Sequence, residues 1–448
     1  MPASLTVSQD RPPLATLARI MELAAVFACL VLFTEGLLPR LFASEENPDS
    51  AFLRLLWLPV YGLVGLGCLF KFRAVLHATM RLPFLMLILA LACLSWLWSI
   101  DPAVTERRAI AIAATTAAGL FLAVRYDWRT LLRMLGAVWL FLGVISFAAG
   151  IVVPAFAVMD DIHVGAWRGL WWEKNAMGGH MARAAFLMAF LALMDRPWRL
   201  IWAGGIVLCT ALVVLSTSKT ALLGLLTGFA VLGAAVWMRR GIVSTLSLIW
   251  LGAILTGVIG LVLIVNPALF FEVLGRDATL TGRTDIWTAL FDAIGARPWF
   301  GYGYAAFWGA DSQPAYMVRL ATEWAVPTAH NGWIETALSI GLVGLVGLAL
   351  NFLLMIARSA WLAVTDWTGI YALGMCAQFL LFSISESIAL QQNTIVWVTY
   401  VAIAAKVAVT VREKTLASRR MPAPGSVSAI GRKRFARPVR RPGLVRTR

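Results

Sequence analysis

The stretch HNGWIETALSIGLVGLVGLALNFLLMIAR, residues 330–358, decides the class of fold. The polar residues His330 and Asn331 open it and Arg358 closes it, while residues 333–356 are predominantly apolar. A helix needs about 20 such residues to cross the hydrocarbon core of a bilayer. The pattern therefore predicts a transmembrane helix with a histidine at one water–membrane boundary.

Apolar runs of this kind recur along the whole chain. The 448 residues are 60% hydrophobic and only 14% charged, whereas a soluble globular protein has about 25% charged residues. Apolar windows predict about twelve spans, at residues 18–39, 53–70, 82–100, 109–125, 132–153, 177–194, 199–216, 221–238, 243–265, 333–356, 369–388 and 394–411. No secretory cleavage pattern follows the first run, so that span is expected to be retained. The predicted fold class is all-α, a polytopic membrane protein.

The basic residues of the short loops predict an orientation. Lysine and arginine are enriched in cytoplasmic loops. Here they follow the even-numbered spans, at Lys71, Arg73, Arg81, Arg125, Arg129, Arg133, Arg196, Arg199, Arg239, Arg240 and Arg358. Arg107 and Arg108 are exceptions. Both termini are therefore predicted to be cytoplasmic, and the large loop between spans nine and ten, residues 266–332, is predicted to be periplasmic.

Three regions follow from this topology. Residues 1–17 form a cytoplasmic N-terminal segment, residues 18–411 form the membrane domain with its loop 266–332, and residues 412–448 form a basic cytoplasmic tail. Between Val411 and Arg448 there are twelve lysines and arginines, opposed only by Glu413. Beside a span, such a tail favours contact with anionic lipid over nucleic acid, and its Pro, Ser and Gly content predicts disorder.

The cysteines indicate neither a disulfide nor a metal site. All five lie inside predicted spans without C-x-x-C spacing, at Cys29, Cys68, Cys93, Cys209 and Cys376. They are expected to be small packing residues. The adjacent acids Asp160 and Asp161 have no further ligand nearby, so no metal and no cofactor is predicted.

His330 is the strongest candidate for chemistry, because histidine can exchange a proton near neutral pH. Asn331 can cap the helix that follows. Gly341 and Gly344 would let another helix approach closely. This support would hold the imidazole as rigidly as a general base requires. The alternative is a histidine in water, or one hydrogen-bonded at a helix start.

Arg283 lies on the same predicted side of the membrane. It follows Gly282 and precedes residues 286–294, whose apolar side chains recur at helical spacing and predict an amphipathic helix on the membrane surface. An arginine at a helix start favours a phosphate, and the glycine gives close backbone access. The alternative is an arginine that snorkels at the interface.

Three further cations map to that side. Lys219 lies at the outer end of span eight, where snorkelling is the alternative explanation, and Lys174 lies beside Asn175 where span six begins. Arg183 is about two turns into span six, so it is predicted to face the bundle interior or a cavity. Together with Arg283, these residues are the predicted ligands of a diphosphate.

Aromatic side chains are dense in the same loops, at Trp171, Trp172, Trp299, Tyr302, Tyr304, Trp308, Tyr316 and Trp324. They form either an interfacial belt or surfaces on which sugars stack, with Trp171, Trp172 and Trp308 as the candidates. Cations for a diphosphate, a base and aromatic surfaces suit the transfer of a sugar from a polyprenyl-diphosphate carrier.

Three motifs carry a resemblance to a known family. His330-Asn331, nine residues and Gly341-x-x-Gly344 resemble the signature of the bacterial O-antigen ligase and polymerase superfamily. Residues 281–283 (TGR) with Trp287 are similar to its second-loop arginine motif, and residues 94–102 (LSWLWSIDP) to the end of its third span. The resemblance implies an inner-membrane glycosyltransferase of about twelve spans that uses undecaprenyl-diphosphate-linked glycans without a metal or cofactor.

One departure from that family bears on the acceptor. O-antigen ligases usually carry an arginine where this chain has Lys219, and lysine lacks the bidentate fork. With residues 173–175 (EKN), this favours the exopolysaccharide polymerase branch, with the lipid-linked oligosaccharide as donor and acceptor and with chain-length and export proteins as partners. An O-antigen or protein glycan ligase is the alternative. A transporter or flippase would instead predict charges near mid-membrane and paired broken helices.

Overall fold

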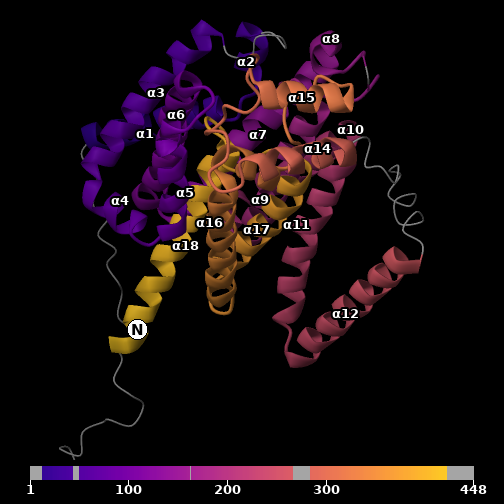
Figure 1. Ribbon diagram of the computed structural model, residues 1–448. Coiled ribbons are helices and arrows are strands. Elements are labelled where there is room, and N and C mark those ends of the chain that lie inside the picture. Colours follow the sequence, from indigo (N-terminus) through magenta and orange to yellow (C-terminus); the bar gives the residue numbers. More distant parts are fainter. Residues whose placement is uncertain (1–12, 44–49, 162, 266–282, 421–448) are drawn as a thin grey trace, which may run out of the picture.

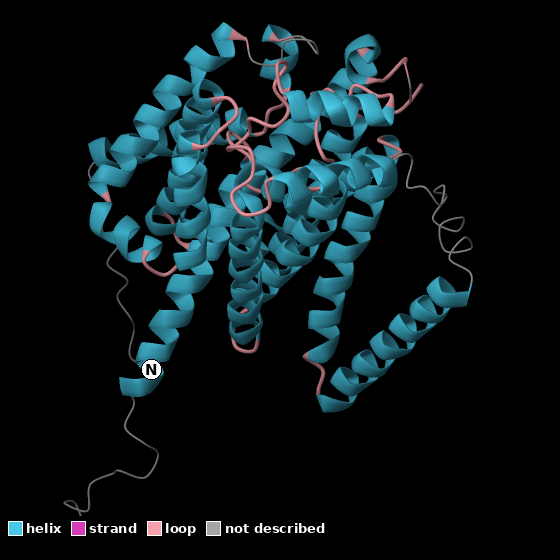
Figure 2. Ribbon diagram, viewed as in Figure 1, coloured by secondary structure: helices cyan, strands magenta, loops and turns pink. Residues whose placement is uncertain are grey.

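The structure is a computed structural model that describes residues 13–43, 50–161, 163–265 and 283–420. In these ranges the regular structure is helical, and the β-structure found there is one isolated bridge between Val158 and Trp167. Helices run side by side as a bundle, and the longer loops gather at one end of it (Figures 1 and 2). The all-α, polytopic fold class is therefore confirmed.

A helix lies over each of the predicted spans. In chain order these are α1 (Pro13–Phe33), α3 (Ala51–Phe70), α5 (Pro83–Leu94), α6 (Pro102–Arg125), α7 (Trp128–Val152), α9 (Lys174–Met194), α10 (Arg199–Leu215), α11 (Lys219–Met238), α12 (Ile242–Val265), α16 (Gly332–Ala363), α17 (Trp367–Ser385) and α18 (Ile395–Arg420). Among the described residues, nine helices are long and apolar enough to cross a membrane. The short α4 (Phe72–Thr79) and α5 meet at a 99° bend and form a tenth if they are one span.

Local capping explains where several helices begin. The Asp101 carboxylate accepts a hydrogen bond from the Val104 amide at the start of α6, and Asp127 does the same for Thr130 at the start of α7. The break between α10 and α11 is the one least marked in the sequence. There Thr217 adopts a left-handed backbone conformation (φ 52°), and the Ser218 hydroxyl accepts from the Ala221 amide.

The main hydrophobic core lies between α6, α7, α9, α16, α17 and α18, with α16 near the centre (Figure 1). Two buried amide side chains inside it are paired, as a low-dielectric interior favours. Asn351 donates to the Tyr400 hydroxyl at 2.8 Å, and Gln378 donates to the Gly224 carbonyl at 2.9 Å. These bonds tie α16 to α18 and α17 to α11.

A second, smaller apolar cluster forms what we call the outer lobe. It joins α14 (Arg283–Ala296) and α15 (Gln313–Thr322) to the first turns of α16. Ile286 and Leu290 of α14 are buried against residues that include Val318, Ile334 and Leu338. The predicted amphipathic helix is therefore present. Ile286 and Leu290 of its apolar face pack against protein, whereas Phe291 is 59% exposed.

Short helices complete the chain: α2 (Leu37–Phe42), α8 (Pro154–Ala157) and the single 3-10 turns Ser95–Leu97 and Arg196–Trp198. Residues 266–282 of the predicted loop 266–332, and 421–448 of the predicted tail, lie outside the described ranges.

Candidate active site

The histidine motif has nine residues between Asn331 and Gly341. The structure explains this number, because the helix begins after Asn331 and breaks at Gly341. Asn331 caps α16 as predicted: its side-chain oxygen accepts from the amides of Trp333 at 2.9 Å and Ile334 at 3.2 Å. The helix then breaks at Ile340 and Gly341, and Gly341 adopts φ 72° and ψ −175°. The nine residues between the two parts of the motif thus form one short helical segment with a fixed start and end.

The break in α16 is held by the loop of residues 298–303, which we call the clamp loop. The Pro298 carbonyl accepts from the Leu342 amide at 2.7 Å, and the Tyr302 amide donates to the Leu338 carbonyl at 2.8 Å. A side chain at Gly341 would overlap the Trp299 carbonyl. This corrects the predicted role of the two glycines. Gly341 admits a loop backbone and not another helix, and Gly344 makes room for the Ile340 side chain.

The third motif, residues 94–102, supports the clamp loop from its other side. The Ser95 hydroxyl accepts from the Tyr304 amide at 2.9 Å, the Ile100 amide donates to Tyr302 at 3.0 Å, and the Trp98 indole donates to Phe300 at 2.9 Å. Hydrogen bonds therefore connect three segments that are far apart in the sequence: residues 95–100, 298–304 and 338–343. Together they fix the position of the first helical segment of α16.

His330 directly precedes Asn331, the cap of this helical segment. Its backbone conformation is unfavourable, and its side chain is enclosed by neighbouring residues. Its backbone is left-handed (φ 47°), which is uncommon for a residue with a side chain. Its ring stacks on Trp324, with the centroids 5.8 Å apart and the planes at 6°. Nδ1 lies 3.7 Å from a carboxylate oxygen of Glu386, an ion-pair distance rather than a hydrogen bond. Nε2 is buried and, within the described residues, has no hydrogen-bond partner.

Glu386, the residue that faces the histidine, was not among the predicted site residues. It ends α17 and carries a partly exposed carboxylate. The sequence does contain a signal for it, because Glu386 falls within the apolar run 369–388. Placing an acidic side chain inside a membrane span costs free energy, so such residues are rare and usually have a function.

Arg183 reaches the same place from α9. Its guanidinium carbon lies 4.7 Å from the ring centre of Phe382, which is one turn before Glu386 on α17. Nη2 lies 3.2 Å from Nδ1 of His180. Nε and Nη1 are buried without a hydrogen-bond partner in the part of the chain that is described.

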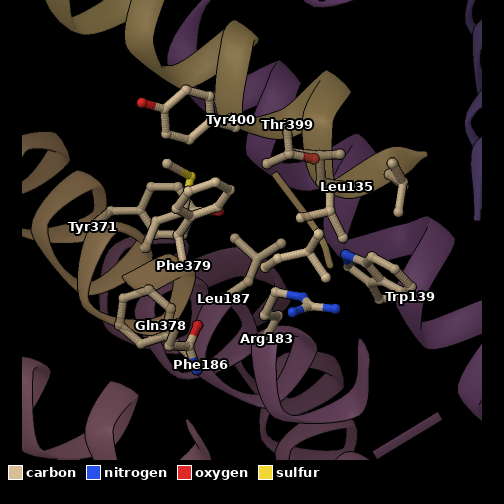
Figure 3. A pocket seen from close by; sticks show the side chains of 14 residues that line it. Leu135, Trp139, Arg183, Phe186, Leu187, Tyr371, Gln378, Phe379, Thr399 and Tyr400 are labelled. Atoms are coloured by element: carbon tan, nitrogen blue, oxygen red, sulfur yellow. The ribbon is translucent and has the colours of Figure 1, made fainter. Parts of the chain in front are cut away.

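Arg183 also borders an internal cavity, as the prediction that it faces the bundle interior required. Figure 3 shows its guanidinium beside Trp139, among the side chains that line a space between α7, α9, α17 and α18. Most of the lining is apolar, and Gln378, Thr399 and Tyr400 are among its polar members. Arg183 therefore has two N–H groups without a hydrogen-bond partner in the described structure. They lie where the polar residues around His180 meet the apolar lining of the cavity.

Lys174, Asn175 and Lys219 form a second group at the starts of α9 and α11. Lys174 donates to the Thr217 hydroxyl at 3.3 Å, and the Ser218 hydroxyl donates to Asn175 at 2.8 Å. Two helix N-termini and two lysines thus meet, which is a favourable environment for an anion. The two lysine segments come together as predicted from span counting.

Arg283 is placed only through its backbone. It is the first residue of α14, and Gly282 lies outside the described residues. Four residues later, the Trp287 indole donates to the Ala329 carbonyl at 3.0 Å. The start of α14 is therefore held beside the peptide that leads into His330.

The three predicted sugar-stacking tryptophans have different surroundings. Trp171 is 3% exposed, its indole donates to the Thr34 carbonyl and its ring packs on His180. This corrects the prediction for Trp171, because its faces are not open to a sugar. Trp172 and Trp308 are partly exposed, and the Trp308 indole donates to the Glu335 carboxylate at 2.9 Å. Trp324, which is 48% exposed and stacks on His330, is an aromatic surface that the predicted site omitted.

Glu335 supports the histidine loop from within α16. Its partly buried carboxylate accepts from the Ala329 amide at 3.0 Å as well as from the Trp308 indole. Glu335 therefore connects Trp308 to Ala329, the residue before His330.

Comparisons with known proteins agree with this arrangement. Residues 204–349 match the family model described as O-antigen ligase. The chain is 28% identical over 307 residues to the exopolysaccharide production protein ExoQ of Rhizobium meliloti (strain 1021). That match covers 65% of this chain and 66% of the relative, slightly less than two thirds of the relative's length.

The fold and the motifs define a polytopic membrane protein of the ligase and polymerase type. Residues 204–349 carry the O-antigen ligase match, and this match and the similar exopolysaccharide production protein support the resemblance to the O-antigen ligase and polymerase superfamily that the motifs predicted. The matched residues 204–349 include Lys219, Arg283 and the whole histidine motif, whereas Arg183 and Glu386 lie outside them.

Proposed function

We propose that the protein is a membrane glycosyltransferase that joins undecaprenyl-diphosphate-linked oligosaccharide repeat units into exopolysaccharide at the periplasmic face of the bacterial inner membrane. The observation that carries the proposal is the state of His330. One ring nitrogen faces Glu386, while the other is buried and unpartnered within the described residues. A buried nitrogen without a partner is left to accept a hydrogen bond from a substrate hydroxyl, as a general base must.

The reaction needs a hydroxyl of one glycan to attack the anomeric carbon of another. His330 Nε2 accepts the hydroxyl proton as the new glycosidic bond forms, and the bond from the anomeric carbon to the diphosphate breaks. The Glu386 carboxylate favours the tautomer with the proton on Nδ1 and stabilises the imidazolium that results. Positioned proton transfer of this kind contributes typically about 10²–10⁴-fold in rate.

The leaving diphosphate gains negative charge as the bond breaks. Arg183, with two buried and unpartnered nitrogens, is the cation best placed to stabilise that charge. Lys174, Lys219 and Arg283 supply further positive charge at the same end of the bundle. The apolar lining next to Arg183 suits a donor whose diphosphate is joined to a lipid.

Two observations support a polymerase over a ligase. Lys219 stands where O-antigen ligases usually have an arginine, and the similar protein from Rhizobium meliloti is named for exopolysaccharide production. An O-antigen or protein glycan ligase would use the same base with a different acceptor. The proposal also includes both termini in the cytoplasm and chain-length and export proteins as partners.

The lipid-linked intermediates of a strain that depends on this protein test the function. His330→Ala and His330→Gln should leave an inserted protein at normal level, while single repeat units accumulate on the carrier and polymer disappears. His163→Ala is the matched control, since His163 is an exposed histidine in a loop at the same end of the bundle. Wild-type chain lengths from His330→Gln would remove the base from the mechanism.

A further inference from the structure

The far end of α16 from His330 carries a pocket that the proposed reaction does not use. It is lined by residues at the bend before α5 and near the ends of α16 and α18: Met80, Arg81, Pro83, Arg358, Ala408, Val411, Arg412 and Thr415. The pocket has a volume of about 410 Å³, within the ~300–1,000 Å³ range of small-molecule sites. Arg358 is 26 residues beyond the first residue of α16, so this pocket and the histidine lie roughly 40 Å apart along that helix.

Three arginines make the pocket strongly positive. Arg358 donates to the backbone carbonyl of Arg81 at 2.9 Å, which holds the two residues side by side. The Arg81 guanidinium donates to His77 rather than to an acid. Among the described residues, no carboxylate lies within ion-pair distance of Arg81, Arg358 or Arg412. Like charges this close raise the energy of the empty pocket and favour an anion.

The surroundings of the pocket indicate that its anion is part of a lipid. Met80, Pro83, Ala408 and Val411 give it apolar walls. The neighbouring α4 turns through 99° into α5, and it exposes Phe72, Leu76 and, just after it, Met80. Apolar side chains exposed on a short helix at the end of a span are placed to contact acyl chains at a membrane surface. The pocket thus combines cations at headgroup level with an apolar flank.

The basic tail of this chain is excluded as the occupant by its charge. Residues 411–448 contain twelve lysines and arginines and one acid. A segment of that charge would be repelled by the three arginines of the pocket. An anionic lipid would instead be attracted by them.

We propose that the pocket of Arg81, Arg358 and Arg412 binds the phosphate-bearing headgroup of an anionic phospholipid of the membrane leaflet opposite the active site. The arginines contact the phosphate oxygens, and the acyl chains lie along Met80, Pro83 and the outer faces of α4 and α5. This site is independent of the proposed glycosyl transfer, so either conclusion can fail without the other.

Native mass spectrometry of the full-length protein tests this site. The protein is mixed with equal amounts of phosphatidylglycerol and phosphatidylcholine, and the retained lipids are counted. Wild type should retain phosphatidylglycerol preferentially. Arg412→Gln, at an exposed residue of α18, should lower that retention about fivefold, the factor equivalent to the ~1 kcal/mol that each basic residue contributes near an anionic surface. Adding Arg81→Gln should lower it further.

Arg196→Gln is the matched control, because Arg196 is an exposed arginine at the same end of the bundle and outside the pocket. It should retain phosphatidylglycerol as wild type does. Equal retention of the two lipids by wild type, or unchanged retention by Arg412→Gln, would overturn the proposal. Loss of bound phosphatidylglycerol in millimolar inorganic phosphate would assign the pocket to free phosphate and overturn its assignment to a lipid.

Discussion

Two clusters of charged side chains lie toward opposite ends of α9 and differ in how their polar atoms are used. At the end of α9, the buried carboxylate of Asp195 accepts hydrogen bonds from Arg133 at 2.7 Å, Arg129 at 3.0 Å and the Trp202 indole at 3.1 Å. Nearer its start, Arg183 and His330 keep buried nitrogens without partners in the described structure.

The difference distinguishes a cluster that stabilises the fold from the cluster for which we propose a function. Polar atoms that are buried and paired stabilise a fold, and the Asp195 cluster joins α7, α9 and α10 in this way. Buried polar atoms without partners are costly and need an explanation. A substrate that brings its own hydroxyl and phosphate oxygens explains them at the His330 end. The comparison predicts that substitutions at the two clusters have opposite consequences for activity and stability.

The largest effect on activity, His330 apart, is expected at Arg183. Arg183→Gln should lower polymer synthesis by about 10²-fold or more, because a neutral side chain leaves the charge of the departing diphosphate uncompensated in a partly dry site. The rate of repeat-unit joining by purified protein measures this. Arg183→Lys keeps the charge but loses the planar fork, so it should retain more activity than Arg183→Gln. Equal losses in both variants would indicate a packing role.

Gly341→Ala should lower both activity and stability. The side chain would have to adopt a backbone conformation that L residues rarely occupy, and it would overlap the Trp299 carbonyl. The clamp loop must then move, at a cost of about 3 kcal/mol, and the support of His330 moves with it. Thermal unfolding in detergent and polymer yield are the measurements. Gly233→Ala, in an α11 position with open space around it, is the control and should be neutral or slightly stabilising.

The smallest effect on turnover is expected at Asp195, where stability should change instead. The hydrogen-bonded Arg133 guanidinium holds the pKa of the Asp195 carboxyl at about 2, below the unfolded value of ~3.9. Its stabilisation is therefore fully present above about pH 4 and is lost as the pH falls toward about 2. Asp195→Asn should cost about 2 kcal/mol at neutral pH, since the arginines are partly exposed, and should flatten that acid dependence.

Thermal unfolding of wild type and Asp195→Asn between pH 3 and 7, with turnover per folded molecule, checks this prediction. A variant that unfolds as wild type does but loses turnover would reverse the assignment of the two clusters. It would make the paired cluster the functional one.

Local patterns predicted much of the fold. Apolar runs gave the helices, Asn331 was recognised as a cap from its position, and the two lysine segments were placed at one end by counting spans. The break at Gly341 was not predicted, because it depends on the clamp loop some 40 residues earlier in the chain. For the same reason the apolar face of α14 was assigned to the membrane, although Ile286 and Leu290 contact the outer lobe.

The candidate site was predicted less completely than the fold. His330 and Arg183 were found because their residue types are unusual in their settings. Trp171 was misassigned because the sequence does not show that His180 covers its ring. Trp324 was not included because its stacking on His330 appears only in the three-dimensional structure. Glu386 was not included although an acid inside the apolar run 369–388 is a signal in the sequence, and its distance of 3.7 Å to His330 requires the structure.

The central claim is that His330 and Glu386 act as one unit on the attacking hydroxyl. The most direct measurement is a double-mutant cycle on the rate at which purified protein joins lipid-linked repeat units, with His330→Gln, Glu386→Gln and both together. Residues that act as a unit are strongly non-additive. The account predicts that Glu386→Gln alone slows the reaction by about 10-fold or more, and that the double variant is no slower than His330→Gln. Losses that multiply in the double variant would show independent roles and contradict the account.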